Sequence, residues 1–153
     1  MLRFLGNIDA KLDVKGRAFV PAAFRKLLQQ LGNTELILRK DIFQNCLVLY
    51  PIPVWDEEVS RLRSSLSRWG KRQQHIFRQF LLDAERLEMD ASGRILIPKR
   101  YQEMIGLETE VRFLGIDNTI EIWAKEELES TLISPDDFGM ELERLMNGDY
   151  EQQ

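Results

Sequence analysis

The sequence predicts an α+β fold in which one unit of strand, turn, strand and helix is used twice. Three observations predict it. The stretch from Asp13 to Pro21 returns in altered form as Asp90 to Pro98, an offset of 77 positions (90 − 13). In both copies, turn-forming residues stand beside short β-branched and aromatic runs, which are typical of strands. The apolar positions after each proline follow a helical spacing and match at the same offset.

The first unit begins with a strand over 4–12, followed by a tight turn from Asp13 to Gly16. Aspartate suits the first turn position because its carboxylate can accept a hydrogen bond from the amide two residues on. Glycine suits a position that requires a positive φ. Residues 17–20 then form a short second strand.

A helix follows Pro21, which has no amide for a sheet but whose fixed φ suits the first helical turn. Gly32 stands where a C-terminal cap belongs. One face of this helix is apolar and consists of Phe24, Leu27, Leu28 and Leu31. Strands over 35–38 and 46–50 complete a first repeat that we assign to residues 1–53.

Residues 54–86 are predicted to form a helical hairpin that links the repeats. Apolar residues recur with a helical period from Trp55 to Trp69, Gly70 interrupts the pattern, and a second helix continues to about Leu82–Arg86. Its Trp and Phe side chains are expected in the core. Residues 61–86 carry seven basic and two acidic side chains. This face contacts nucleic acid, is solvated, or pairs with the acidic tail of a neighbour.

The second repeat is assigned to residues 87–124 and runs in the same order. It contains the end of a strand over 87–89, the turn from Asp90 to Gly93, and a strand over 94–97. A helix follows Pro98, and strands over 110–115 and 119–123 close the repeat. Residues 125–153 are predicted to form a short helix and an acidic tail. A final short helix after Pro135 would be ordered by a partner.

Composition and motifs limit the classes of function that the chain can have. With 44% hydrophobic and 30% charged residues in 153, the chain has the composition of a folded domain, and no apolar run approaches the ~18 residues of a membrane span. Cys46 and His75 are the only residues of their types. We expect Cys46 in the core or at a sheet edge and His75 exposed on a helix. Without a metal-spaced cluster, a nucleotide loop or a nucleophile motif, we expect no enzyme, cofactor, metal or small-molecule substrate.

Charge is segregated along the chain. The net charge of −4 argues against a nucleic-acid partner, but residues 1–30 carry six basic and two acidic side chains, a net charge of +4. Residues 126–153 carry nine acids and one base, a net charge of −8. This asymmetry suggests one surface that faces a polyanion and a tail that is solvated or faces a partner.

The two turns have a chemistry suited to anions. Units of about 50 residues must bury their strands against a partner face, so two in tandem would pair as an internal pseudo-dimer with their turns near one another. Lys15 and Arg17 flank Gly16, and cations on a rigid turn can bind phosphate or reach a guanine edge. Alternatively, the turn is purely structural and Arg17 pairs with Asp13, which the isolated pattern favours.

The stretch from Leu12 to Pro21 with Arg25, and its second copy from Asp90 to Pro98, resembles the signature of the MraZ family. Tyr50-Pro-Ile-Pro-Val-Trp55 and the start Phe4-x-Gly6 also match, and the resemblance covers about residues 1–132. The wider relatives are AbrB-like swapped-hairpin DNA-binding domains. The resemblance therefore implies two tandem AbrB-like swapped-hairpin β-barrel repeats that form an internal pseudo-dimer, with helical segments after each repeat.

The resemblance also implies a cytoplasmic, nucleoid-associated transcriptional regulator of the bacterial division and cell-wall gene cluster. It would bind promoter direct repeats in double-stranded DNA as a ring-shaped homo-oligomer. The ring would offset weak, salt-dependent binding by single subunits through avidity. The alternative is an AbrB-like oligomerisation module or an antitoxin-type protein-interaction module.

Carried onto this chain, the resemblance makes Arg17 the leading DNA contact, with Lys15 beside it. Arg94 is the counterpart of Arg17, but Ser92 replaces Lys15, so we expect the first turn to dominate binding. The second turn would then be structural or part of a subunit contact. The residues expected to shape the turns are Asp13, Gly16, Asp90 and Gly93. A further possibility is that the two aspartates pair with the arginines across a protomer interface.

Overall fold

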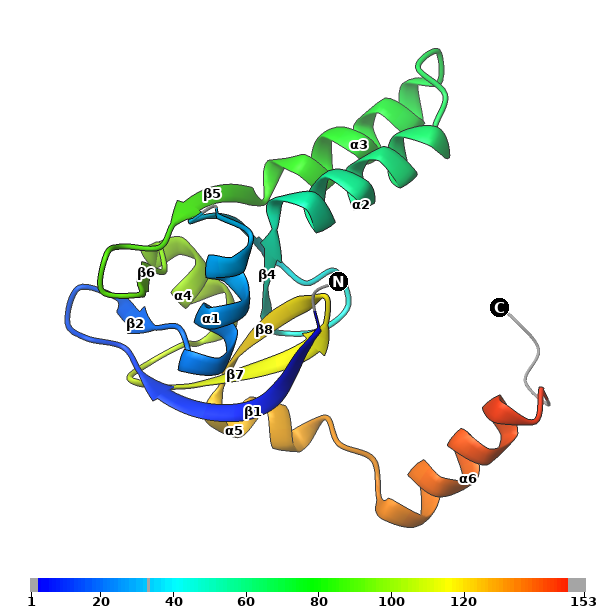
Figure 1. Ribbon diagram of the computed structural model, residues 1–153. Helices are drawn as coiled ribbons and strands as arrows, with labels where there is room; N and C mark the ends of the chain where they lie inside the picture. The colour runs from blue at the N-terminus through cyan, green and yellow to red at the C-terminus, as the bar shows by residue number, and fades with distance from the viewer. Residues whose placement is uncertain (1–2, 33, 149–153) are drawn as a thin grey trace.

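The two copies of the repeated unit share one six-stranded antiparallel sheet. The computed structural model describes residues 3–32 and 34–148, and its ribbon is shown in Figure 1. The strands of the sheet lie in the order β1-β7-β8-β4-β3-β5, and β2 and β6 form a separate two-stranded ribbon. A mixed α+β fold, as predicted, is therefore confirmed.

The described residues form strands and helices with the following bounds. The strands are β1 (Phe4–Lys11), β2 (Arg17–Phe19), β3 (Glu35–Lys40), β4 (Leu47–Pro51), β5 (Ala84–Glu88), β6 (Arg94–Leu96), β7 (Glu110–Asp117) and β8 (Thr119–Ala124). The helices are α1 (Ala22–Gln30), α2 (Ile52–Ser64), α3 (Lys71–Leu82), α4 (Lys99–Ile105), α5 (Lys125–Ser130) and α6 (Pro135–Met146).

The two halves exchange their first strands. β1 of the first half pairs along its whole length with β7 of the second half, from Phe4 opposite Asp117 to Lys11 opposite Glu110. β5 of the second half pairs in turn with β3 of the first half. β4 and β8 pair at the centre of the sheet. Each half thus supplies the edge strand of the other, whereas the assignment of the halves to the AbrB-like swapped-hairpin class stays a prediction.

One hydrophobic core contains side chains from both halves. Phe24 and Leu28 of α1 and Tyr101 and Ile105 of α4 are buried, in agreement with the predicted apolar faces of these helices. The ring of Phe24 meets that of Phe4 edge-on, with centroids 5.7 Å apart. Because the core is shared, neither half has a complete hydrophobic core of its own.

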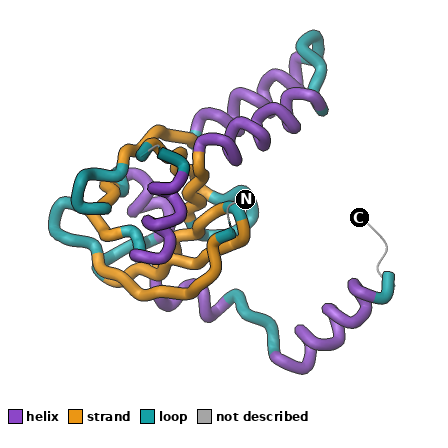
Figure 2. Tube along the Cα trace, in the orientation of Figure 1, coloured by secondary structure: helices purple, strands orange, loops and turns teal. Residues whose placement is uncertain are grey.

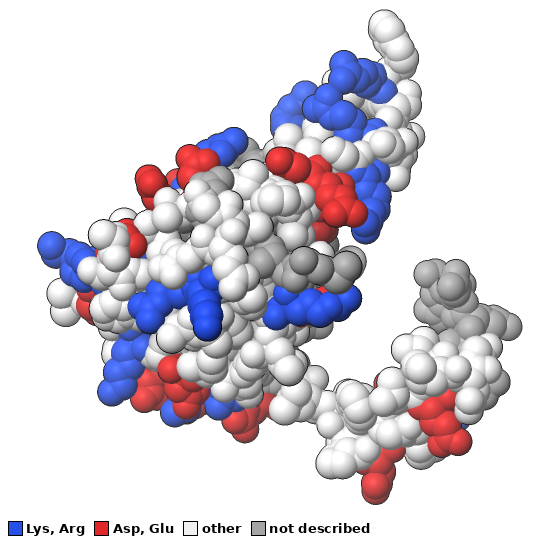
Figure 3. Space-filling model, in the orientation of Figure 1, with Lys and Arg blue, Asp and Glu red and all other residues white. Residues whose placement is uncertain are grey.

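The helical hairpin of α2 and α3 projects from this body (Figures 1 and 2). Its base is fixed by Trp55, which stacks on Phe80 with ring centroids 5.5 Å apart. Arg39 of β3 lies over the same Phe80 ring at 4.4 Å, and its Nε donates a hydrogen bond to the Phe80 carbonyl. Beyond the base, Lys and Arg side chains cover the hairpin, whereas Asp and Glu side chains lie near the body (Figure 3).

The second helix of the hairpin ends at Leu82, within the predicted range, but the predicted extension of the first helix to Trp69 is wrong. α2 ends at Ser64, where the hydroxyls of Ser64 and Ser65 donate hydrogen bonds to carbonyls four residues earlier. Trp69 therefore lies outside the helix with 97% of its surface exposed, not in the core. Residues 84–86 are not helical, because they pair with β3 as part of β5.

The C-terminal helices differ in their packing. α5 buries Leu128 beside Trp123, whereas all residues of α6 are exposed and the helix stands clear of the body (Figure 1). Ser134 caps α6, and its hydroxyl accepts a hydrogen bond from the Asp137 amide at 3.2 Å. The predicted final helix is thus present, and residues 149–153 of the predicted tail lie outside the described residues. None of the described helices combines the length and hydropathy needed to cross a membrane.

Gly115 offers a test of the strand exchange. It lies in β7 opposite Gly6 of β1, and an added Cβ would stand 2.6 Å from the Phe4 carbonyl carbon. Gly115→Ala should lower the free energy of unfolding by about 1–3 kcal/mol, because backbone atoms of β1 would have to move. Urea unfolding measures this change. Gly139→Ala in α6 is the control: nothing lies within 4 Å of its added Cβ, so a comparable loss there would contradict the steric explanation.

Candidate nucleic-acid interface

A single carboxylate organises the first turn. Asp13 Oδ1 accepts hydrogen bonds from the amides of Lys15 and Arg17, both at 2.9 Å, and Oδ2 accepts one from Arg17 Nε at 2.8 Å. The Gly16 amide donates to the Asp13 carbonyl at 3.0 Å. This geometry places Lys15 at the outside of the turn and ties Arg17 to its own loop.

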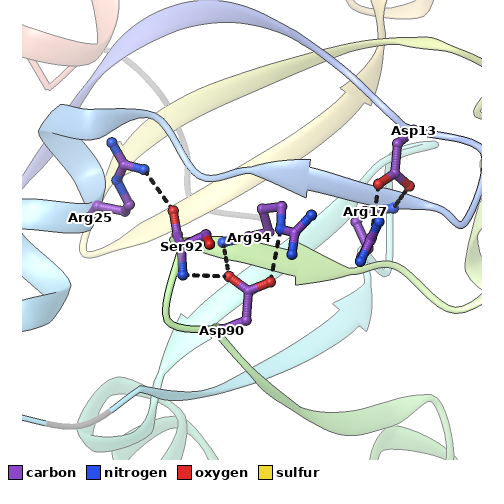
Figure 4. A network of polar contacts seen from close by, with 6 residues as sticks. All are labelled: Asp13, Arg17, Arg25, Asp90, Ser92 and Arg94. Atoms are coloured by element: carbon purple, nitrogen blue, oxygen red, sulfur yellow. Dashed lines mark hydrogen bonds and ion pairs between the residues drawn. The ribbon is translucent and has the colours of Figure 1, made fainter.

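The second turn repeats this geometry. Asp90 Oδ1 accepts from the amides of Ser92 and Arg94 at 2.9 Å, and Oδ2 accepts from Arg94 Nε at 2.8 Å, as Figure 4 shows. Both ion pairs form within one turn, so the pairing of Arg17 with Asp13 that the pattern favoured is present. In this single chain no pairing of these residues across protomers is involved.

Each turn forms a backbone hydrogen bond with the opposite half of the chain. The Gly16 carbonyl accepts a hydrogen bond from the Ile97 amide at 2.9 Å, and the Gly93 carbonyl accepts one from the Val20 amide at 3.0 Å. Both glycines have positive φ, +86° and +88°. The positive φ favours glycine at position 16, and a Cβ there would displace the side-chain amide of Gln102, whose Nε2 would lie 2.4 Å away.

The ribbon of β2 and β6 joins the two turns and has one buried and one exposed face. Ala18 opposes Ile95, and both are buried. Arg17 opposes Leu96 and Phe19 opposes Arg94, and these four side chains lie on the other face. Phe19 and Leu96 are more than half exposed, so the outer face of the ribbon combines two arginines with two apolar side chains.

The side chains around the two arginines are not equivalent. The Arg94 guanidinium lies 5.8 Å from the centre of the Phe19 ring, whereas Arg17 faces the aliphatic Leu96. Lys15 and Lys99 line a groove of about 420 Å³ beside the first turn. At the offset of 77, Lys99 corresponds to Ala22, whereas Glu108 lines the same groove and Arg25 contacts the second turn where Gln102 contacts the first.

Two contacts of the turns were absent from the sequence predictions. Arg25 donates a hydrogen bond from Nη1 to the Ser92 carbonyl at 3.3 Å, and Gln102 donates one from Nε2 to the Ile97 carbonyl at 2.8 Å. Arg25 packs against Gly93 and Gln102 against Gly16. Arg25 and Gln102 are equivalent positions of the two copies at the offset of 77, so the repeat could have indicated that both have the same role beside a turn.

Electrostatics keep the two aspartates charged. The pKa of Asp13 is lowered chiefly by the hydrogen bond from the Arg17 amide, and that of Asp90 by the one from the Arg94 amide. The arginine side chains beside them add to this lowering. Asp13 engages only Nε of Arg17, so the terminal guanidinium nitrogens form no hydrogen bond or ion pair with any residue in 3–32 or 34–148. They remain available to an anion or a base edge.

The single cysteine and the single histidine of the sequence lie away from the turns. Cys46 is buried, as expected, and burial raises the pKa of its thiol. His75 is exposed on α3, also as expected, with Nδ1 3.0 Å from Arg78 Nη1. Within residues 3–32 and 34–148, no three His, Cys, Asp or Glu residues lie close enough together to hold a metal ion.

The fold and the turns define a class of small α+β proteins in which two halves exchange strands and present paired Asp–Arg turns on one ribbon. The chain belongs to the MraZ family. The model of that family, described as "MraZ protein, putative antitoxin-like", matches residues 80–134. The matched region contains the second turn, residues 90–94.

Relatives named "Transcriptional regulator MraZ" align with nearly the whole chain. The relative from Bacteroides thetaiotaomicron is 53% identical over 99% of this chain and 97% of its own length. That from Bacteroides fragilis is 56% identical over 95% and 92%, respectively. A more distant relative from Pelotomaculum thermopropionicum is 37% identical over 82% and 83%. These relatives are named as regulators and not as enzymes.

The lowered pKa values of Asp13 and Asp90 predict a loss of stability in acid. A group whose folded pKa lies below its unfolded value of about 3.9 stabilises the fold above that value and loses this effect as pH falls through the folded pKa. The free energy of unfolding should therefore fall more steeply from about pH 5 to about pH 2 in the wild type than in Asp13→Asn/Asp90→Asn. Urea titrations at several pH values measure both slopes. Asp56→Asn, on the exposed surface of α2, should keep the wild-type slope, and equal slopes in all three proteins would contradict the assignment.

Proposed function

We propose that this protein is a DNA-binding transcriptional regulator that reads double-stranded DNA with the outer face of the β2–β6 ribbon and the first turn. One observation carries the proposal: two arginines stand on an exposed ribbon, each oriented by a carboxylate that engages only its Nε. Membership of a family whose relatives are named transcriptional regulators supports it.

The ribbon has a suitable shape and chemistry for this task. The major groove of DNA admits a two-stranded antiparallel ribbon, and an arginine can donate two hydrogen bonds to guanine O6 and N7. A guanidinium already fixed through Nε loses little side-chain entropy when its terminal nitrogens bind. Lys15, exposed at the edge of the turn, is placed to contact a phosphate.

The first turn is proposed to supply the larger share of binding. Lys15 and Lys99 stand beside it, whereas Ser92 and Ala22 occupy the corresponding positions at the second turn, where Arg25 is the neighbouring cation and already donates a hydrogen bond to the Ser92 carbonyl. Arg94 also differs from Arg17, because it lies over the Phe19 ring and gains a partner within the chain. We therefore assign Arg17 and Lys15 to direct DNA contact, and Arg94 to a weaker contact.

We further propose that several subunits act together in a ring-shaped homo-oligomer, in the cytoplasm and associated with the nucleoid. One subunit offers few phosphate contacts, so it would bind weakly and in a salt-dependent way. Linked subunits on promoter direct repeats gain affinity because each later contact is intramolecular. On the basis of the family resemblance, we propose that these repeats lie upstream of the division and cell-wall gene cluster.

A second candidate is a non-enzymatic interaction module of the antitoxin type. The exposed apolar side chains of α6 and the wording of the matched family description favour it. Binding of the purified protein to its own upstream DNA, compared with scrambled DNA, separates the two functions. An interaction module would show no preference for the upstream sequence.

The two arginines provide a matched pair of variants. Each makes the same bonds to its own aspartate, so Arg17→Ala and Arg94→Ala should disturb their turns equally. Arg17→Ala should abolish specific binding, a loss of about 1–3 kcal/mol or more for a bidentate contact, whereas Arg94→Ala should cost less. Fluorescence anisotropy with upstream DNA measures both affinities. Equal losses would show that both turns face DNA, and normal binding by both variants would remove the ribbon as the site.

Lys15 tests the phosphate contact separately. Lys15→Ser gives the first turn the side chain that Ser92 supplies in the second. The slope of log K against log salt concentration should decrease in magnitude by about 0.9 per subunit bound, the value for one lost phosphate contact. Lys71→Ser, which removes the same charge from the hairpin, is the control and should leave the slope unchanged. A shared change in both variants would point to net charge instead of a local contact.

A further inference from the structure

Two helical elements of this chain have apolar surface that the chain itself does not bury. α3 and α6 each contain 12 residues and neither has a fully buried one. Phe138 and Leu145 of α6 are 54% and 61% exposed. On the hairpin, Leu82 is 70% exposed and Trp69 almost completely exposed. Exposed apolar surface on this scale marks an interaction site.

α6 is an amphipathic helix whose apolar face has an acidic border on one side. Phe138, Leu142 and Leu145 follow the spacing i, i+4, i+7 and form the apolar face. Successive residues are about 100° apart around a helix, so Asp137 and Glu141 lie beside this face, whereas Asp136 and Glu143 lie nearly opposite it. With Arg144 as the one basic residue, the helix has a net charge of −3.

The hairpin carries a groove of complementary character. Half-buried Leu66 and Phe77, together with Leu81, line a groove of about 380 Å³ between α2 and α3. Three arginines line the same groove: Arg63, Arg68 and Arg78. The Arg63 guanidinium lies 4.8 Å from the centre of the Phe77 ring. Residues 61–78 include six Lys or Arg side chains and no acid. Figure 3 shows a patch of Lys and Arg side chains on the hairpin.

The topology keeps these two elements apart within one chain. β4 and β8 are antiparallel neighbours, so the helices that follow them leave from opposite ends of the sheet. α2 follows β4 directly, and α5 follows β8 and leads to α6 through only four residues, 131–134. In Figures 1 and 2 the hairpin and α6 do not touch.

We infer that α6 of one copy docks in the α2–α3 groove of a second copy of this chain. Charge complementarity selects this occupant, because a basic groove with an apolar lining matches an acidic helix with an apolar face. Both helices are about 18 Å long, so α6 can lie along α3 over its whole length. The contact joins different surfaces of the two copies, so it is head-to-tail and generates a ring where the rotation closes.

This docking rests on the homo-oligomer proposed above but not on DNA binding. The test therefore uses no DNA. Two charge-reversed proteins are prepared at full length: Arg63→Glu/Arg78→Glu in the groove, and Asp137→Lys/Glu141→Lys beside the apolar face of α6. Light scattering after size exclusion at low salt gives the mass of each protein alone and of an equimolar mixture.

Each variant alone should need about tenfold more protein than the wild type to associate, which corresponds to 1.4 kcal/mol. The mixture should regain the wild-type mass, because each variant groove then meets an α6 of opposite charge from the other chain. Lys71→Glu/Arg72→Glu is the control, since it changes the net charge of the hairpin equally while neither residue lines this groove. It should associate as the wild type does.

Several results would overturn the inference. These are a monomeric wild type, variants that associate normally, or a mixture that fails to recover. Circular dichroism checks folding, and Leu142→Ser adds a variant in a helix that does not pack on the body, with an expected tenfold weakening of about 1.4 kcal/mol. Failure of the Arg17 experiment would leave this docking standing, and failure here would leave the ribbon as a DNA site.

Discussion

The structure depends on the way in which each half completes the sheet of the other. A strand edge exposes unpaired amides and carbonyls, and two units of about 50 residues are too small to bury such edges separately. The pairing of β1 with β7 and of β5 with β3 covers the outer sides of β7 and β3, and leaves β1 and β5 as the edges of one shared sheet. The turns follow from this exchange, because the Gly16 and Gly93 carbonyls each accept an amide from the opposite half. The position of each arginine is therefore fixed by the whole fold and not by its own turn alone.

A symmetric backbone with unequal side chains allows the two sites to diverge. Asp13 and Asp90 each accept a hydrogen bond of 2.9 Å from the amide of the arginine four residues on, so the turns share one conformation. The differences begin where side chains meet the other half: Phe19 lies under Arg94, but Leu96 lies beside Arg17. In such a duplication, the backbone preserves presentation of both guanidinium groups while neighbouring residues tune the affinity of each. The aspartate and glycine of each turn therefore serve folding, whereas the side chains beside each arginine can differ between the two copies.

Much of this could be predicted from the sequence where the signal was local. The turn from Asp13 to Gly16 and the helix after Pro21 follow from residue chemistry at fixed spacing. The exchange of strands could not be predicted in this way, because pairing partners far apart in sequence leave no local pattern. The end of α2 and the strand at residues 84–86 were missed for a related reason: serines compete for the helix backbone, and pairing with β3 overrides an apolar period. For the site, the turn residues were predictable, whereas the Phe19–Arg94 contact depends on the ribbon register.

The distribution of charge explains how a chain of net charge −4 can present basic surfaces. Fields from exposed charges are screened within about 8 Å at physiological salt, so the local balance matters more than the sum. The acids of α6 stand on a helix that leaves the body, and the six bases of residues 61–78 stand on a hairpin at the other end of the sheet. Had these charges been mixed on one surface, they would have neutralised one another within each chain. Their separation to opposite ends leaves the attraction to act between chains, and it leaves the ribbon under the influence of its own lysines and arginines.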